Sequence, residues 1–294
     1  MAEPSFHNPL YQIGCPVWGC PEFRGSVFPA RAPKATWLKH YTRLFNTVEG
    51  NSTFYGIPQR STFERWAEQS APGFKFALKF PRAVSHDHML VGAQLETDLF
   101  LDGLAALHDA EKLGTTFLQL GPAFGPARLN ALANYLKNLP QQFRYGVEVR
   151  NHDWFDASAE SELIGLLTET DIDYVIFDSR PLYSMPPTDE FEKASQKRKP
   201  RTPFRTTVTG RNPMLRLIGR NNVSEVQSWV DEWAEVVAEW IADGRQPSIF
   251  AHTPDDQHAP ALARMFHNAL AQRVPNLDPF DQWPYVGQTQ MELF

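Results

Sequence analysis

The chain has 294 residues, of which 42% are hydrophobic and 21% are charged, and this balance excludes a disordered tail, a fibrous repeat and a disulfide-stapled miniprotein. The net charge of -6 argues against nucleic-acid binding over the whole surface, but it is compatible with a local basic patch or a docking peptide. Two cysteines, Cys15 and Cys20, are too few for a disulfide framework. The sequence starts without the basic and apolar regions of a signal peptide, and it has no run of about 18 apolar residues. We therefore expect a soluble cytoplasmic protein with no membrane segment.

Eight short apolar runs recur along the chain at intervals that suit alternating strands and helices. They are residues 12–18, 45–54, 75–80, 115–121, 144–150, 173–179, 214–220 and 248–253. Amphipathic helices are predicted between most of them; Trp37, Leu38, Tyr41 and Leu44, for example, fall on one helical stripe. Strands that alternate with helices predict an α/β fold with a parallel sheet. Eight such units predict a single (β/α)8 barrel of the TIM type over residues 1–280.

The connection between the sixth and seventh predicted strands departs from this pattern. Residues 186–206 are proline-rich and basic where a helix with an apolar stripe would be expected, so we predict an irregular excursion from the barrel. Two interpretations stay open for this segment. It is either a solvated loop or a lid that contacts an anion at the strand ends, where barrel sites are built.

Polar side chains recur at interior positions of the predicted strands. Since strand residues alternate between the two faces of a sheet, aliphatic neighbours that face the helices identify the residues that point inward. In residues 144–150, Val147 and Val149 face the helices, so Glu148 and Arg150 point inward. The same reasoning places six further residues inside: Glu49, Asn51, Lys79, Gln119, Asp178 and Arg216. His252 fits less well, because an apolar residue, Phe250, shares its face.

Three carboxylates and three cations in one interior permit two interpretations. They could form a structural network in which opposite charges offset the cost of burial. They could instead form an active site in which Lys79, Arg150 and Arg216 bind a phosphate or carboxylate. Glu49 and Glu148 would then share the acid and base roles, because neighbouring carboxylates push their pKa values apart, as hydrolysis of a glycosidic or phosphoester bond requires. We favour the active site, since a packed aliphatic interior would serve stability better.

Further groups near the predicted strand ends extend this candidate site. His86 follows the third strand and is either a proton carrier or metal ligand, or a solvated loop residue. The aromatic residues Trp18, Phe54, Tyr55 and Trp154 form either a stacking wall for a sugar or base, or simple rim packing.

A divalent cation is a further alternative. Glu49, Glu148, Asp178, His86 and His252 could surround one, but the sequence has no HExxH spacing and no cysteine quartet. The neighbouring cations would also compete for the same carboxylates. We therefore predict no metal site and no cofactor, with a divalent metal as the alternative.

Five strings carry a resemblance to a known family: FNTVEGNSTFYGIP, FKFALKFPRAVSH, LQLGP, YGVEVRNHDWF and FDSRP. From about Ile13 to the last helix, the sequence resembles the YecE-like proteins, a family known as domain of unknown function 72. The resemblance implies a single TIM-type barrel of unknown activity, with signature residues at the mouth. The positions of this sequence that match signature residues of the family are Glu49, Asn51, Thr53, Tyr55, Lys79, His86, Gln119, Glu148, Arg150, Trp154 and Asp178. The strings LIGRN and FAHTPDD depart from the family pattern, so the resemblance gives His252 no role.

The last residues, QMELF, form a separate motif in a predicted tail of residues 281–294. Gln290, Leu293 and Phe294 resemble the Q-x-x-L-F peptide by which bacterial polymerases and repair proteins dock on the sliding clamp. A free tail would insert its Leu-Phe pair into a pocket of such a partner. In the alternative, Leu293 and Phe294 pack back on the barrel.

Together these features predict a hydrolase that acts on a phosphate-bearing or sugar-containing substrate. The catalytic candidates are Glu49, His86, Glu148 and Asp178. The substrate-binding candidates are Trp18, Asn51, Thr53, Tyr55, Lys79, Gln119, Arg150, Trp154 and Arg216. Clamp docking would direct such an enzyme to DNA or its fragments. Two alternatives are a non-catalytic barrel that binds a ligand in its mouth, and a carbohydrate-processing enzyme with no link to DNA and an aromatic sugar platform.

Overall fold

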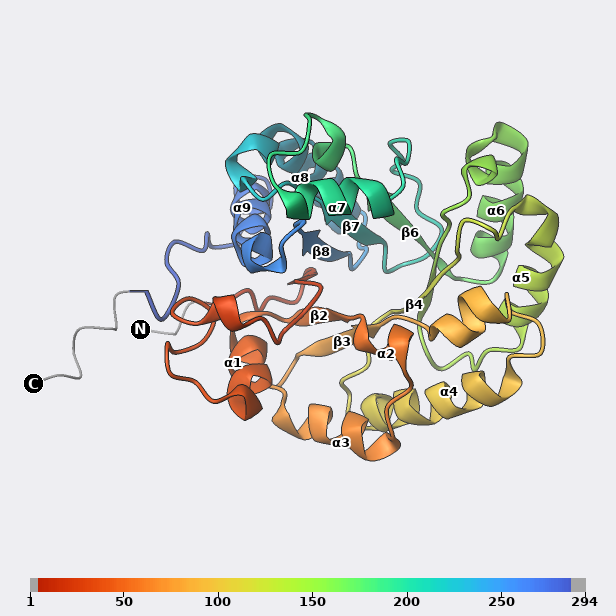
Figure 1. The fold of residues 1–294 in the computed structure, drawn as a ribbon, viewed down its shortest axis with the longest axis horizontal. Helices are drawn as coiled ribbons and strands as arrows, with labels where there is room; N and C mark the ends of the chain where they lie inside the picture. The colour runs from red at the N-terminus through yellow and green to blue at the C-terminus, as the bar shows by residue number, and fades with distance from the viewer. Residues whose placement is uncertain (1–4, 287–294) are drawn as a thin grey trace, which may run out of the picture.

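A computed structural model describes residues 5–286 and contains eight parallel strands in this range. All eight predicted strands are confirmed. They are β1 (Gln12–Gly14), β2 (Thr47–Gly50), β3 (Lys75–Leu78), β4 (Thr116–Gln119), β5 (Tyr145–Glu148), β6 (Asp173–Asp178), β7 (Met214–Ile218) and β8 (Ser248–His252). Six of them form one sheet in the order β1-β8-β7-β6-β5-β4, and β2 pairs with β3 in a second sheet (Figure 1).

The predicted closed (β/α)8 barrel is wrong. The six-stranded sheet is an open half-barrel whose edge strands are β1 and β4. Between β1 and β2, the Glu49 amide donates to the Cys15 carbonyl at 3.0 Å, and isolated bridges link Lys79 to Phe117 and Phe76 to Leu113 between β3 and β4. Strands of three or four residues offer too few hydrogen bonds for a continuous ladder at these two junctions. The sequence pattern predicted the number of strands, but closure depends on this pairing.

Nine helices cover the strands within residues 5–286. They are α1 (Trp37–Leu44), α2 (Ser52–Tyr55), α3 (Arg60–Gln69), α4 (Gln94–Asp109), α5 (Leu129–Lys137), α6 (Ala157–Glu169), α7 (Glu190–Arg198), α8 (Gln227–Ala242) and α9 (Ala259–Ala271). The longer helices lie along the outside of the strands (Figure 1). The predicted stripe of α1 is confirmed, because its apolar residues are buried in the main core. In this described range, no helix combines the length and the apolar character needed to cross a bilayer.

The interior of the sheets is layered along the strands. One apolar layer consists of Ala77, Phe117, Val175, Met214 and Phe250, which form a cluster separate from the main core under the helices. Two residues further along three of these strands come Lys79, Gln119 and Arg216. Since side chains two apart share a face, the polar groups lie directly above the apolar layer, toward the carboxyl ends of the strands. We call the side of the molecule at which these ends meet the carboxyl-end face.

The excursion between β6 and β7 contains the helix α7, which the sequence pattern did not predict. Helix α7 has no apolar stripe, and its Phe191 is 57% exposed. An ion pair holds it instead: Glu192 of α7 and Arg220, which follows β7, meet at 2.7 Å with both side chains buried. The Asp189 side chain caps the helix by accepting from the Glu192 amide at 2.8 Å. The prediction of an irregular excursion is therefore wrong for residues 190–198, because a polar anchor leaves no apolar periodicity to detect, whereas residues 199–213 have no helix or strand.

The two ends of the described chain pack together beside α1 (Figure 1). Phe6 stacks on Phe280 with ring centroids 4.4 Å apart, and Trp283 packs edge-on against Phe280 at 5.1 Å. The Tyr285 hydroxyl reaches His40 of α1 at 3.3 Å. Thus much of residues 280–285 is in contact with the body of the molecule. The docking residues Gln290, Leu293 and Phe294 lie outside the described residues.

Candidate functional site

Arg216 is the centre of a buried group of charges at the carboxyl-end face. Its guanidinium donates to both carboxylate oxygens of Glu49, each at 2.7 Å, and to Glu148 at 2.5 Å. These side chains come from β7, β2 and β5, so the ion pairs connect the two sheets. Arg216 is 4% exposed and both glutamates are fully buried. Three predicted site residues are therefore in direct contact.

Two further cations complete this group. Arg150 donates to Glu148 and, at 3.1 Å, to the Gln119 side-chain oxygen, which also accepts from the Lys79 ammonium at 3.0 Å. The Arg150 guanidinium lies over the Phe177 ring at 3.8 Å. We call Glu49, Lys79, Glu148, Arg150 and Arg216 the ion cluster. The convergence that the alternation pattern predicted for these five side chains is present in the structure.

Three other residues position Glu49 and the strand ends. Asn51 donates to Glu49 at 2.7 Å, and His252 of β8 contacts the same carboxylate at 3.0 Å. The Thr53 hydroxyl donates to the Lys79 carbonyl at 2.6 Å and to the Gly50 carbonyl at 3.1 Å, so it joins the ends of β2 and β3. Asn51 and Thr53 thus hold the cluster in place rather than facing solvent.

The two glutamates of the cluster remain ionised. Burial alone would raise the pKa of Glu49, but the Arg216 guanidinium and then His252 hold that pKa well below its ordinary value. Burial is likewise outweighed at Glu148, where Arg150 and Arg216 lower the pKa. Both carboxylates in turn raise the pKa of Arg216, against the effect of its burial. Two carboxylates that are both held ionised do not supply the separated pair of pKa values that acid and base catalysis uses.

Two lysines near the cluster have lowered pKa values, so their charged form is disfavoured, in contrast to the two glutamates. Burial and the neighbouring Arg216 lower the pKa of Lys79 to about 7, and burial, Arg216 and Arg150 lower the pKa of Lys199 to about 7. Among the described residues, neither ammonium has a carboxylate within ion-pair distance; Asp256 offsets part of the Lys199 charge from further away. Lys199 was not singled out from the sequence. The signal that could have found it is the basic excursion, for which a lid that contacts an anion was one of the two open interpretations.

His86 lies on the same wall of the site as Lys79. The Lys79 ammonium lies 3.8 Å from the centre of the Phe54 ring, and His86 packs against Phe54 at 5.1 Å. Burial and then Lys79 lower the pKa of His86, whose Nδ1 lies 2.8 Å from the Ser85 hydroxyl. Beside Phe54, Tyr55 is 83% exposed. This wall therefore offers two nitrogen bases and one accessible aromatic ring.

Asp178 does not join the cluster, and its predicted inward orientation is wrong. Its carboxylate pairs with Arg180 at 2.8 Å and accepts from the Trp233 indole of α8 at 2.7 Å, on the helix side of the sheet. Its neighbour Phe177 points inward instead, under Arg150. Strand β6 has the sequence DYVIFD, with four apolar residues in a row, so it has no alternation from which to assign the inward face.

The predicted tryptophan platform is also absent from the described site. Trp154 is fully buried and donates its indole N–H to the Phe124 carbonyl at 2.7 Å. Trp18 packs edge-on against Trp66 at 5.3 Å. Their positions near strand ends were correct, but each ring is used in packing. Of the four aromatic residues predicted as a stacking wall, Tyr55 alone is exposed in the range the structure covers.

The hypothetical ring of metal ligands is not assembled. Within residues 5–286, no group of three or more His, Cys, Asp or Glu side chains is arranged to hold a metal ion. Arg216 occupies the space between Glu49 and Glu148, and Asp178 faces α8. The donor atoms that a cation would need are thus already paired with guanidinium groups.

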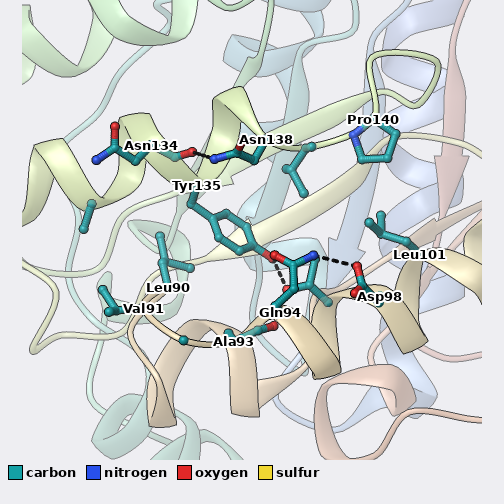
Figure 2. Close-up of a pocket in the computed structure, with 14 residues that line it drawn as sticks. Leu90, Val91, Ala93, Gln94, Asp98, Leu101, Asn134, Tyr135, Asn138 and Pro140 are labelled. Atoms are coloured by element: carbon teal, nitrogen blue, oxygen red, sulfur yellow. Dashed lines mark hydrogen bonds between the residues drawn. The ribbon is translucent and has the colours of Figure 1, made fainter.

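A separate groove of about 660 Å³ lies between α4 and α5, away from the ion cluster. Figure 2 shows its wall, where the Tyr135 ring extends from α5 toward Gln94 of α4, and Leu101 lies beside Asp98. The Tyr135 hydroxyl is bonded to Thr97 at 2.8 Å. The cluster of perturbed titratable groups is elsewhere, so we assign the candidate site to the carboxyl-end face.

The fold and the site define a class of protein: a parallel half-barrel sheet, completed by a two-stranded sheet, with a buried ion cluster at the carboxyl ends of the strands. Residues 12–284 match the family model described as protein of unknown function DUF72, and the chain belongs to that family. The UPF0759 protein YecE from Escherichia coli K12 and its counterpart from strain O157:H7 are each 34% identical over 270 residues, which is 91% of this chain and 95% of theirs.

Two solved structures of DUF72 family proteins share the fold. One, from Enterococcus faecalis, superposes with a TM-score of 0.68 at 17% identity and covers 92% of this chain and 99% of its own. Another, from Thermotoga maritima, has a TM-score of 0.62 at 21% identity and covers 87% of this chain and 97% of its own. At these low sequence identities, the structural similarity shows a shared fold and nothing further. The family is one of unknown function, so the activity has to be argued from the site.

Proposed function

We propose that the ion cluster binds the phosphate or carboxylate group of an anionic ligand. The observation that carries this proposal is a surplus of buried positive charge. Glu49 and Glu148 balance Arg216 and Arg150, which leaves the ammonium of Lys79 without a carboxylate partner among the described residues, at 7% exposure. A buried cation that lacks a counter-ion is costly, and an anion that replaces the missing partner recovers that cost.

The same geometry supports hydrolysis of a phosphoester as the chemistry at this site. The pKa of His86 is lowered, so its ring is neutral near pH 7 and can accept a proton. In the proposed step a water molecule attacks phosphorus as the P–O bond to the leaving alcohol breaks, and His86 accepts the water proton and returns it to the leaving oxygen. Arg150 or Lys199 would stabilise the negative charge of the transferred phosphoryl group. Our proposal therefore assigns the proton to His86, keeps Lys79 as the cation that pairs with the anion, and gives Glu49 and Glu148 the role of holding the cations in place.

The binding proposal is tested with inorganic phosphate, at a pH near 6.5 so that Lys79 is protonated. Thermal unfolding is followed across a phosphate titration, with potassium chloride of equal ionic strength as reference. Saturating ligand at about a hundred times its Kd stabilises the folded state by about 2.7 kcal/mol. We expect this effect in the wild type and in Lys137→Met, a control on the exposed end of α5, and not in Lys79→Met. An equal response of the two variants would contradict the proposal.

Hydrolysis has its own test. The wild type is assayed on a panel of phosphomonoesters and phosphodiesters, and His86→Gln and Lys79→Met are compared on any substrate that turns over. Loss of turnover in His86→Gln, with phosphate binding retained, supports the proposed proton transfer. Full activity of both variants would refute it. Binding without turnover of any substrate would favour the alternative of a non-catalytic ligand-binding protein.

We also propose, from the sequence alone, that the QMELF end docks on a bacterial sliding clamp. The chain before this motif is held against the body of the protein, where the Tyr285 hydroxyl contacts His40 of α1. The test is fluorescence anisotropy of a labelled peptide ending in QMELF against a purified clamp. Saturable binding that a Leu293→Ala, Phe294→Ala peptide lacks would support docking, and equal behaviour of the two peptides would refute it.

A further inference from the structure

A basic segment borders the ion cluster at the carboxyl-end face. It consists of Lys197, Arg198, Lys199 and Arg201, and we call it the basic rim. No Asp or Glu occurs in the sequence between Glu192 and Glu225, although the whole chain has a net charge of -6. Three of the four rim side chains are exposed, and Lys199 is half-buried. The rim is thus a local concentration of positive charge on an acidic protein.

Hydrogen bonds fix the rim along the carboxyl end of β6. The Tyr183 hydroxyl donates to the Lys199 carbonyl, and Ser179, which directly follows β6, donates to the Pro200 carbonyl at 2.8 Å. The Thr202 hydroxyl donates to the carbonyl of Phe177. The Phe177 ring carries the Arg150 guanidinium, so the rim and the ion cluster are neighbours. Lys199 links the rim to the cluster, since its ammonium interacts electrostatically with both Arg150 and Arg216.

The helix dipole explains part of this charge but not all of it. Lys197 and Arg198 lie in the last turn of α7, where cations are favourable. Lys199 and Arg201 follow the helix, and Arg201 is held over the Tyr183 ring at 4.5 Å. Among the described residues, no rim cation forms an ion pair with a carboxylate; Asp256 acts on Arg198 and Lys199 from a longer distance. The rim is therefore free to bind an external anion.

An aromatic ring lies on the other side of Lys79. Tyr55 is 83% exposed and stands edge-on to Phe54, with centroids 5.2 Å apart and an angle of 88° between the rings. The face of Phe54 carries the Lys79 ammonium. A ligand whose anionic group reaches Lys79 therefore has an accessible aromatic surface beside it.

We propose that the ligand of the ion cluster is a single-stranded nucleic acid, with phosphates on Lys79, Lys199 and the rim and a base stacked on Tyr55. This inference rests on the proposed anion site and names its ligand class. A charged backbone track combined with an aromatic platform is the arrangement that binds single strands without sequence preference. A flat lipid surface would reach the exposed rim but not Lys79, which is 7% exposed, whereas a thin strand can reach both.

The experiment measures fluorescence anisotropy of a labelled oligothymidylate of about twelve nucleotides with the full chain, over a series of salt concentrations. The test variant is Lys197→Ala, Arg198→Ala, Arg201→Ala. Its matched control is Arg31→Ala, Lys34→Ala, Lys39→Ala, which removes three exposed cations near α1. We expect the test variant to lower the slope of log affinity against log salt by about 2, or about 0.7 per lost phosphate contact. The control should match the wild type.

Two further measurements separate the parts of the inference. Tyr55→Ala should weaken oligonucleotide binding on the order of tenfold while keeping the salt slope, because stacking releases no counterions. The rim variant should keep its response to inorganic phosphate. Equal losses in the rim variant and the control, or binding to anionic phosphatidylserine vesicles in place of the oligonucleotide, would overturn the inference. A wild type that binds phosphate but no oligonucleotide would also overturn it and leave the anion site standing. Failure to bind either ligand would refute both.

Discussion

Replacing Arg216 by methionine should destabilise the protein strongly. The guanidinium pairs with Glu49 and Glu148, and the three side chains are between 0% and 4% exposed. Removing one partner of a buried ion pair leaves uncompensated charge and costs about 3–5 kcal/mol. After the substitution Glu148 still has Arg150, whereas Glu49 keeps His252 and Asn51. The larger share of the loss should therefore come from Glu49.

The double variant Arg216→Met, Glu49→Gln isolates that contribution. Urea denaturation at pH 7 gives the free energy of unfolding of the wild type, both single variants and the double variant. Because the glutamine is neutral, we expect the double variant to be more stable than Arg216→Met alone. A double-mutant cycle then reports the coupling between the two positions.

The pH dependence gives an independent check of the same reasoning. In the wild type Arg216 keeps the pKa of Glu49 low, so the stability from this pair is present above the ordinary carboxyl pKa and is lost as the pH falls. Without Arg216, burial raises the pKa of Glu49 above that of the unfolded chain. The difference in the free energy of unfolding between the wild type and Arg216→Met should therefore shrink as the pH falls from 7 to 5. A loss below about 1 kcal/mol, or the same pH response in both proteins, would refute the account of the cluster.

Three further predictions concern the surroundings of the cluster. Glu192→Gln should cost about 3–5 kcal/mol by breaking the buried pair with Arg220, and trypsin should then cut faster within residues 186–206; unchanged cleavage would show that the pair does not hold α7. Asp178→Asn should lower the free energy of unfolding by about 1.5–3 kcal/mol and leave phosphate affinity unchanged, which a thermal titration can contradict by showing weaker binding. For Lys79, whose pKa is about 7 in the folded protein against an ordinary 10.5, the unfolded chain holds the extra proton between these values. The stability of the wild type relative to Lys79→Met should therefore rise from pH 7 to 10 in urea titrations, and a flat difference would count against a buried ammonium.

The ion cluster could be predicted from the sequence because charged and apolar residues alternate along three of its strands. Apolar residues flank Lys79 just after β3, Glu148 in β5 and Arg216 in β7, and this identifies the inward face without knowledge of the fold. The prediction for Asp178 failed because this alternation is absent from β6. The sequence of β6, DYVIFD, has four apolar residues in a row and does not show which side chains face inward.

Other features depend on interactions that leave no periodic pattern. Helix α7 is anchored by the Glu192–Arg220 pair, which joins residues that are distant in sequence. The sheet is open because β1, a strand of three residues, lacks a continuous ladder of hydrogen bonds to its neighbour β2. The amino-acid composition does not predict this. Lys199 was contained in the segment identified as basic, but its position beside Arg150 requires the fold.

The central claim is that an anion completes the charge balance at Lys79, and isothermal titration calorimetry with inorganic phosphate tests it most directly. The titration is run near pH 7.5 in two buffers with different ionisation enthalpies. An anion that binds beside Lys79 and Lys199 raises pKa values that now lie at about 7, so each binding event should take up protons from the buffer. We predict a heat that differs between the buffers and a smaller proton uptake in Lys79→Met. Because phosphate also exchanges protons near this pH, the comparison of the two proteins decides: equal proton uptake in the wild type and in Lys79→Met, or no binding at all, would contradict the account.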